Sequence, residues 1–360
     1  MKKITIVLCV LLSLCLTGCE WMNGSFVSVE PYQEQLSLAQ NEALNVSNYQ
    51  QLRLTLEKLV ESGTENAVIG ISEYEPEQVE TGMETALHYI REVLPLGAYA
   101  VEDMRFEIGT VGGEPAVSVE LSYVHGRAEL RKVQKVEDME QAEAVIADTL
   151  IQCADAVVLL VDQFSDMDLV QMVEDYALDN PNVIMEVPQV AVGLYPESGS
   201  SRVVELKFTY QTSRDALRQM QTQVQRVFAS AALYVSSDVE EQKITQLYTF
   251  LTERFDYQFQ TSITPSYSLL CHGVGDSRAF ASAFATMCRR AGLECMVVSG
   301  TCDGEPRFWN LIREGEVYYH VDLLRSKELG SLKLLTDEQM TGYVWDYSAY
   351  PAAGSSAADQ

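Results

Sequence analysis

Between about residue 45 and residue 230 the chain contains one order of predicted elements twice, and this repeat limits the fold more than any other feature. In the first copy, apolar residues at helical spacing are followed by a buried strand, a second amphipathic helix and two strands. These elements are a helix with Leu52, Leu56 and Leu59 on one face, a strand at 67–71, a helix that opens at Pro76 and stops at Pro95, and strands at about 98–108 and 115–124 turned at Gly112 and Gly113.

The second copy repeats this order, which predicts a tandem pair of small α/β modules at 45–136 and 137–230. Its elements are a helix near 139–153, a strand at 156–161, a helix near 166–178, and strands near 183–194 and 202–210. A local match supports the repeat, because four residues recur 87 positions later: Tyr123, Arg127, Leu130 and Arg131 as Tyr210, Arg214, Leu217 and Arg218. Chance similarity between two α/β stretches is the alternative. Neither copy has a glycine-rich phosphate loop or a cluster of metal ligands.

The N-terminus has the pattern of an export signal. Lys2 and Lys3 precede an apolar run of about 13 residues, which is shorter than the roughly 20 that cross a bilayer as a helix. The run ends in Leu-Thr-Gly-Cys, with the cysteine at position 19, and this segment resembles the lipobox of bacterial lipoproteins. The resemblance implies cleavage after residue 18 and lipid on the Cys19 thiol. The alternative is an ordinary signal peptide in which Cys19 is incidental.

We therefore expect a signal peptide at 1–18, a tether at 19–44, and a mature protein lipid-anchored to the extracytoplasmic face of the cell membrane. The chain has 25 Lys and Arg against 52 Asp and Glu, a net charge of −27. Such a surface repels nucleic acid, so we expect no nucleic-acid partner. Beyond the anchor the odd set of five cysteines matches no zinc pattern, which predicts no metal, no cofactor and mostly buried free thiols: Cys153, Cys271, Cys288, Cys295 and Cys302.

From about residue 236 to residue 351 the pattern changes to that of an α+β domain, with a disordered tail predicted at 352–360. Ser237 is positioned to cap a helix with apolar residues at helical spacing, and a second helix begins at Ser277. Three strand-like runs follow, at 294–299, 307–313 and 316–322.

This region resembles the transglutaminase-like superfamily, which has a papain-like fold. The family places a nucleophilic cysteine at the N-terminus of a core helix, a histidine in H-x-W-N on one strand, and an aspartate in W-Y-x-V-D on the next. The matching segments here are Gly275-Asp276-Ser277-Arg278-Ala279-Phe280, Arg307-Phe308-Trp309-Asn310 and Tyr318-Tyr319-His320-Val321-Asp322. The tail Tyr343-Val344-Trp345-Asp346 also resembles the segment that follows the aspartate in that family.

Carried over position by position, the resemblance assigns the nucleophile to Ser277, the base to Arg307 and the orienting acid to Asp322. Serine is a poor nucleophile without a base, and arginine cannot act as one because its pKa lies above about 12. No histidine lies between 273 and 319, so no shift of the alignment supplies one. His320 is the one candidate for an alternative base. The sequence predicts a degenerate triad in which Arg307 and Asp322 form a buried ion pair.

The expected function is a pseudoenzyme: a non-catalytic transglutaminase-like domain on a lipoprotein, acting in binding or as a structural module at the cell surface. Candidates for the lining of an inherited cleft are Trp309, Asn310, Tyr318 and His320. The expected partners are the membrane, through the lipid, and a cell-surface protein or peptide. Two alternatives stay open: an active acyl-transfer or amide-hydrolysing enzyme that uses Ser277, and tandem modules that carry a binding function while the C-terminal domain supports them.

Overall fold

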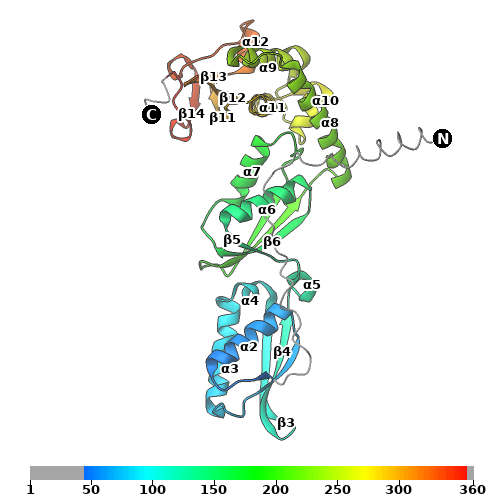
Figure 1. Cartoon of the computed structure of the whole chain (residues 1–360), viewed down its shortest axis with the longest axis vertical. Helices are drawn as coiled ribbons and strands as arrows, with labels where there is room; N and C mark the ends of the chain where they lie inside the picture. Colours follow the sequence, from blue (N-terminus) through cyan, green and yellow to red (C-terminus); the bar gives the residue numbers. More distant parts are fainter. Residues whose placement is uncertain (1–43, 355–360) are drawn as a thin grey trace, which may run out of the picture.

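The computed structural model describes residues 44–354. These residues form three bodies in a row, with the first module at one end, the second in the middle and the C-terminal domain at the other end (Figure 1). The predicted signal peptide, Cys19 and nearly all of the predicted tether lie outside the described residues, as does most of the predicted tail. No helix within 44–354 is long and apolar enough to cross a membrane.

The first module is a four-stranded sheet with helices packed on one face. Its strands have the order β1-β2-β4-β3, in which β1 is parallel to β2 and the other neighbours are antiparallel. The core between α2, α3 and the sheet includes Leu52, Leu56 and Ile69. The elements are β1 Leu44–Asn45, α2 Tyr49–Ser62, β2 Asn66–Gly70, α3 Pro76–Glu92, α4 Pro95–Ala100, β3 Val101–Val111, β4 Glu114–Tyr123 and α5 Arg127–Leu130.

Local signals explain most of these boundaries. The Asn48 side chain caps α2 by accepting from the backbone N–H of Gln51. Gly112 and Gly113 both have positive φ, 63° and 92°, as a tight turn between twisted strands requires. The prediction for 98–108 was wrong at its start, because Pro95 does not only end α3. It is also the first residue of α4, a position that suits proline because the N–H there is unpaired anyway.

The second module has the same topology as the first, which confirms the predicted tandem pair. Its strand order is β5-β6-β8-β7, again with the first pair parallel and the other pairs antiparallel. The elements are β5 Gln134–Asp138, α6 Met139–Ile151, β6 Ala156–Gln163, α7 Leu169–Asp179, β7 Gln189–Tyr195 and β8 Arg202–Thr209. The edge strand β1 was not predicted because it has only two residues, and β5 was not predicted because Val136 is its one apolar residue.

The residues repeated at an interval of 87 occupy equivalent places in the two modules. Arg127 and Arg214 are the first residues of the helices that follow β4 and β8, namely α5 and α8 (Arg214–Tyr234). The Tyr123 hydroxyl donates to the Thr64 carbonyl at 2.9 Å, beyond the end of α2. The Tyr210 hydroxyl is buried without a hydrogen-bond partner in the described part of the chain. The repeat therefore conserves the position of the ring but not its hydrogen bond.

The helix α4 joins the two modules. The Tyr99 ring stacks on His125 with centroids 4.2 Å apart and meets Tyr195 edge-on at 5.4 Å. Val203 of β8 belongs to the core cluster of the first module and Leu160 of β6 packs against it, so the first module covers part of the second sheet. The first module is thus packed against the second rather than tethered to it.

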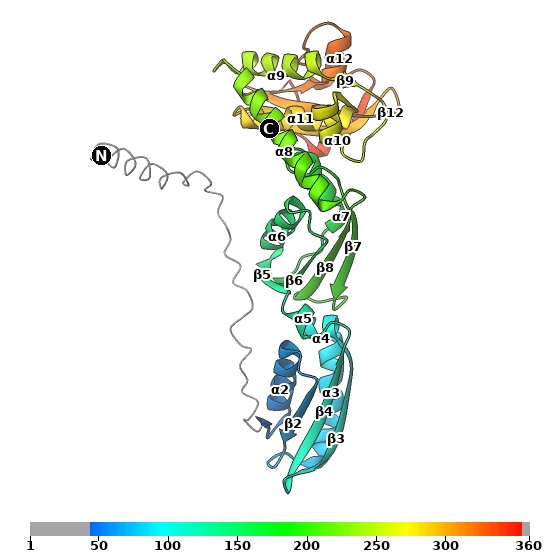
Figure 2. The same cartoon turned by 90° about the vertical axis from the view of Figure 1, so that its right-hand side faces the viewer.

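The C-terminal domain combines helices with a four-stranded antiparallel sheet of order β13-β12-β11-β14. The long helix α8 runs into it from the second module (Figure 2). Its further elements are α9 Glu240–Arg254, β9 Asp256–Tyr257, α10 Pro265–His272, β10 Val274–Gly275, α11 Ser277–Arg290, β11 Cys295–Cys302, β12 Glu305–Glu314, β13 Val317–Val321, α12 Leu323–Glu328, the 3-10 turns at Asp337–Gln339 and Tyr347–Ala349, and β14 Tyr343–Trp345.

Two local predictions for this domain were wrong. Ser237 does not cap α9, which begins at Glu240; its hydroxyl accepts from the backbone N–H of Val239 in the preceding turn. Cys271 lies within α10 rather than in a turn, because the Pro265 start signal and the Gly273 stop signal bound a helix of only eight residues. The five cysteines of the described residues are free, as expected.

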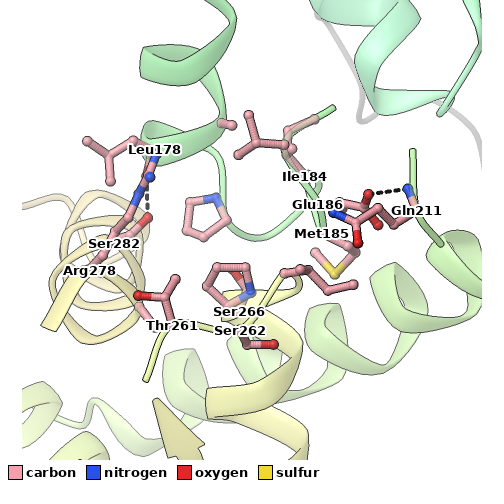
Figure 3. Close-up of a pocket in the computed structure, with 16 residues that line it drawn as sticks. Leu178, Ile184, Met185, Glu186, Gln211, Thr261, Ser262, Ser266, Arg278 and Ser282 are labelled. Atoms are coloured by element: carbon pink, nitrogen blue, oxygen red, sulfur yellow. Dashed lines mark hydrogen bonds between the residues drawn. The ribbon is translucent and has the colours of Figure 1, made fainter. Parts of the chain in front are cut away.

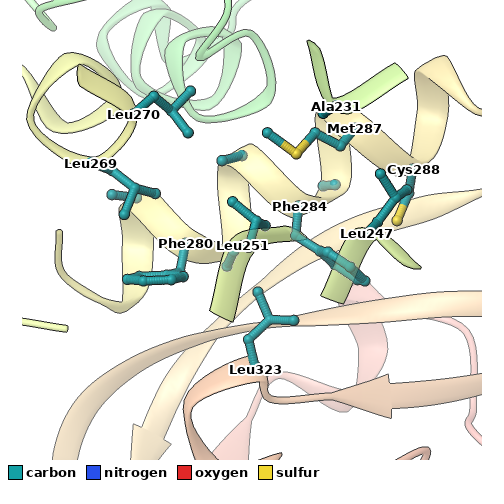
Figure 4. Packing of buried hydrophobic residues seen from close by; sticks show 14 of the residues in the cluster. Ala231, Leu247, Leu251, Leu269, Leu270, Phe280, Phe284, Met287, Cys288 and Leu323 are labelled. Atoms are coloured by element: carbon teal, nitrogen blue, oxygen red, sulfur yellow. The ribbon is translucent and has the colours of Figure 1, made fainter. Parts of the chain in front are cut away.

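The helix α11 is the centre of the domain core. It packs on β11 and β12 on one side and against α8, α9 and α10 on the other. Figure 4 shows Phe280, Phe284 and Met287 of α11 directed into a cluster with Leu247 and Leu251 of α9. Nearly every residue of its first three turns is buried, so α11 is held from all sides and its first residue has a defined position.

Candidate functional site

The N-terminus of α11 is organised by Asp276. One oxygen of this carboxylate caps the helix by accepting from the Ala279 backbone N–H at 2.9 Å, and the other accepts from the Thr261 hydroxyl at 2.6 Å. A Cβ on Gly275 would lie 3.0 Å from Cβ of Leu269, so the chain enters the helix at a close approach that suits glycine. Ser277 is therefore fixed as the first residue of α11.

Ser277 is buried and engaged with the sheet. Its side chain is at the helix start that the family reserves for the nucleophile, and its Oγ accepts from the Phe308 backbone N–H at 3.3 Å. Within residues 44–354, no histidine ring is hydrogen-bonded to it. Nucleophilic catalysis by a serine hydroxyl requires such a neighbouring base.

Arg307 and Asp322 form a bidentate ion pair. Arg307 Nε donates to one carboxylate oxygen at 2.8 Å and Nη2 donates to the other at 2.8 Å. The two side chains are 17% and 2% exposed, so little solvent screens the pair. Burial alone would lower the pKa of Arg307, but hydrogen bonding and attraction to Asp322 outweigh burial and raise the pKa above its usual range. The ion pair predicted from the sequence is confirmed.

The Asp322 carboxylate also receives donors that the sequence analysis did not anticipate. It accepts five hydrogen bonds in all, from two Arg307 nitrogens, from the Tyr343 hydroxyl at 2.9 Å, and from the backbone N–H groups of Leu324 and Arg325 at the start of α12. Burial and the neighbouring Asp322 raise the pKa of Tyr343, which keeps its hydroxyl protonated as a donor. Asp322 thus links β12, β14 and α12, and has no free lone pair to orient a base.

His320 belongs to a separate buried network. Its Nδ1 accepts from the Trp309 indole N–H at 3.0 Å, so the other ring nitrogen carries the proton and Nε2 donates to Asp337 at 2.8 Å. Asp337 in turn accepts from the Ala353 backbone N–H. Burial lowers the pKa of His320, with the hydrogen bond to Asp337 acting in the opposite direction. Both nitrogens are engaged, so His320 is not available as a base for Ser277.

The residues proposed to line a cleft are buried in the domain. Trp309 is 1% exposed, Asn310 and His320 are fully buried, and Tyr318 is 8% exposed. Asn310 donates to the carbonyls of Ala281 and Met296, which ties β12 to α11 and β11. The Tyr318 hydroxyl donates to Glu294. The prediction of a cleft lined by these residues was wrong, because all four are buried within the domain; among residues 44–354 the Asn310 side-chain oxygen is buried without a hydrogen-bond partner.

Three surface cavities of the described residues lie elsewhere, and none of the three is lined by Ser277, Arg307 or Asp322. Residues 44–354 contain no group of His, Cys, Asp and Glu side chains arranged to hold a metal ion. Tyr343 and Asp337 were missed as partners of the site. Both lie in the segment after Asp322, and the resemblance of residues 343–346 to the family tail was a signal that could have pointed to Tyr343.

Residues 229–348 match the family model of the transglutaminase-like superfamily. The C-terminal domain of this chain therefore belongs to the transglutaminase-like superfamily. No curated protein matches the chain.

Three solved structures resemble it at low identity. They are a TGase (10% identity, TM-score 0.26), a provisionally assigned cysteine protease from Cytophaga hutchinsonii (14%, 0.25) and a provisionally assigned protease from Parabacteroides distasonis (9%, 0.23). The matches cover 62%, 41% and 77% of this chain and 66%, 65% and 40% of those chains, so this chain spans just under two thirds of the first two. The assignment of the domain rests on the family match.

Replacing Arg307 by alanine should destabilise the C-terminal domain by about 3–5 kcal/mol, because Asp322 would remain buried and charged without its cation. Ser277→Ala removes one acceptor and should cost about 1 kcal/mol. Arg325→Ala is the matched control, since Arg325 forms only an exposed pair with Glu328 and should change stability by less than about 1 kcal/mol. Urea unfolding followed by the fluorescence of Trp309 and Trp345 measures all three; equal effects of Arg307→Ala and Arg325→Ala would contradict the assignment.

Acidification should weaken the domain through His320. The unfolded chain protonates this histidine near pH 6.5, whereas the folded domain does so only at lower pH. The unfolded state therefore binds more protons in this range, and the free energy of unfolding falls as the pH decreases. His320→Gln should flatten the dependence between about pH 5 and 7 relative to the native chain. The control His88→Gln, at an exposed position, should leave the slope unchanged; an identical slope in His320→Gln would refute this prediction.

Proposed function

We propose that this chain is a lipid-anchored extracytoplasmic protein whose transglutaminase-like domain is non-catalytic and serves as a structural module. The observation that carries the proposal is the bidentate pair of Arg307 with Asp322. By the resemblance to the family, these are the positions of the base and its orienting acid. An arginine stays protonated at any physiological pH, so it cannot accept a proton from Ser277.

The closed state of the site favours a structural role over binding in an inherited cleft. Ser277 is buried against Phe308, and Trp309, Asn310 and His320 are taken up by internal hydrogen bonds. A cleft retained for binding would expose some of these side chains. The binding function of the protein is then carried by the tandem modules, with the C-terminal domain supporting the second one.

An enzyme that uses Ser277 is the competing proposal. Such an enzyme would need a base within hydrogen-bond reach of Oγ, and the one imidazole proposed for that role has both nitrogens engaged. The purified protein should incorporate no fluorescent amine into a glutamine-containing protein and should hydrolyse no peptide above background. Ser277→Ala should leave both readings unchanged. Turnover in the native chain that is lost in Ser277→Ala and kept in the control Ser237→Ala, in the turn before α9, would establish the enzyme instead.

The anchor is tested separately from the chemistry. Cys19→Ala removes the thiol that the lipid would modify, so the variant should leave the membrane fraction or accumulate as an unprocessed precursor of higher mass. A stable anchor needs two acyl chains, and the variant lacks the thiol to which the lipid would be attached. We therefore expect complete rather than partial release. Cell fractionation and intact-mass measurement report the result, with Cys15→Ala as the matched control inside the apolar run. A Cys19→Ala protein that matures and fractionates like the native chain would contradict the anchor.

A further inference from the structure

A cavity of about 290 Å³ lies between the second module and the C-terminal domain (Figure 3). One wall comes from the end of α7 and the segment after it, and the other from the loop before α10 and the first turns of α10 and α11. Hydrogen bonds beside the cavity hold the two bodies together, since Ser282 of α11 donates to the Leu178 carbonyl and Arg289 pairs with Asp179. These contacts fix the two walls of the cavity relative to each other; we call this contact region between the two bodies the joint.

The cavity is apolar for much of its surface and open at one side. Buried Ile184 and Met185 form part of the wall on the module side, with Val187 beside them. Ile263 is 53% exposed at the opposite rim, where it is free to cover an entering apolar group. A volume of this size is near the lower end for small-molecule sites and fits a ligand about as large as one amino acid.

The positively charged side chain of Arg278 lines this cavity. Its guanidinium faces the Phe308 ring at 5.7 Å, and across residues 44–354 it has no ion pair and no hydrogen bond. This is unusual in a chain with 52 acidic and 25 basic side chains, where an arginine has many carboxylates to pair with. An unpaired, half-buried guanidinium at a cavity is a ready partner for an anion.

Two of the acceptor groups that line the cavity, those of Glu186 and Ser262, are already used. Both carboxylate oxygens of Glu186 accept backbone N–H groups, from Gln211 at 2.5 Å and from Thr212 at 3.0 Å. The Ser262 hydroxyl accepts from the Thr264 backbone N–H. The carboxylate of Glu186 is thus directed to the backbone of the β8–α8 connection, although its charge remains in the wall.

Free donors remain around the same space. Ser266 is only 4% exposed, and in the described part of the chain its hydroxyl has no hydrogen-bond partner. The side-chain amide of Gln211, at the rim, is likewise without a partner among residues 44–354. Together with Arg278, these groups offer donors from three elements: α11, α10 and the connection between β8 and α8.

From this combination we propose that the cavity binds a small carboxylate with a short aliphatic body. The carboxylate accepts from Arg278 and Ser266, and the aliphatic body lies against Ile184, Met185 and Ile263. Both bodies of the joint then contact the ligand, so binding stiffens their connection. The site is separate from the Arg307–Asp322 pair, and it stands whether or not Ser277 is catalytic.

The full chain, purified in detergent, is titrated calorimetrically with N-acetylleucine and with N-acetylleucinamide, which has the same body but no carboxylate. The acid should bind saturably and at least about tenfold more tightly than the amide, because a charged hydrogen bond is lost in the amide. Arg278→Gln should weaken the acid by about tenfold or more, Ser266→Ala by a smaller factor, and the control Arg325→Gln not at all. A peptide ending in a free leucine carboxylate is titrated as well. If the peptide binds more tightly than N-acetylleucine, the natural ligand is a peptide C-terminus; if N-acetylleucine binds more tightly, it is a small free acid.

Three outcomes would overturn the proposal: equal affinity for acid and amide, unchanged affinity in Arg278→Gln, or no saturable binding of any probe. Thermal unfolding of each variant verifies that it is folded, and Arg278→Gln should unfold as the native chain does because Arg278 has no ion pair to lose. Should that variant fail to fold, the comparison of acid with amide on the native chain and the Ser266→Ala titration still decide the question. If Ser277 proved to be catalytic, the binding affinities measured here would still decide the question.

Discussion

The buried carboxylate of Asp322 is the constraint on which the C-terminal domain depends. A charge that is 3% exposed is costly unless it is paired and fully hydrogen-bonded, and Asp322 meets both conditions through five donors. Because those donors belong to β12, to β14 and to the first turn of α12, satisfying one carboxylate also sets the positions of three elements. Arg307 contributes the compensating charge, and its two parallel hydrogen bonds set the orientation as well as the distance.

The same interaction determines what the domain can do chemically. A carboxylate saturated in this way cannot orient an imidazole, and a guanidinium cannot take up a proton. Ser277 keeps its place at the start of α11 because Asp276 caps that helix, but its hydroxyl is bonded to the sheet backbone. His320 lies in a different network with Trp309 and Asp337. Ser277, Arg307, Asp322 and His320 are therefore all engaged in hydrogen bonds within the domain.

The three bodies are joined by the ends of helices rather than by flexible linkers. The helix α4 packs on the sheet of the second module, and the end of α7 is hydrogen-bonded to α11. At the second joint the packing is incomplete, and the remaining space holds unpaired donors beside apolar walls. The C-terminal domain supplies one wall of this cavity and the second module supplies the other.

Sequence periodicity, capping residues and the interval of 87 residues were sufficient to predict the two modules with one topology and the helix at Ser277. The resemblance to the family predicted the pair of Arg307 with Asp322. These features are local, or they follow a family pattern that local residues reveal. The tertiary structure alone decided the remainder: Tyr343 bonds to Asp322, Asp337 bonds to His320, and Trp309 and Asn310 turn inward instead of lining a cleft. Each of those outcomes depends on which distant segments meet, and hydrogen-bond partners brought together by folding have no signature in the spacing of residues along the chain.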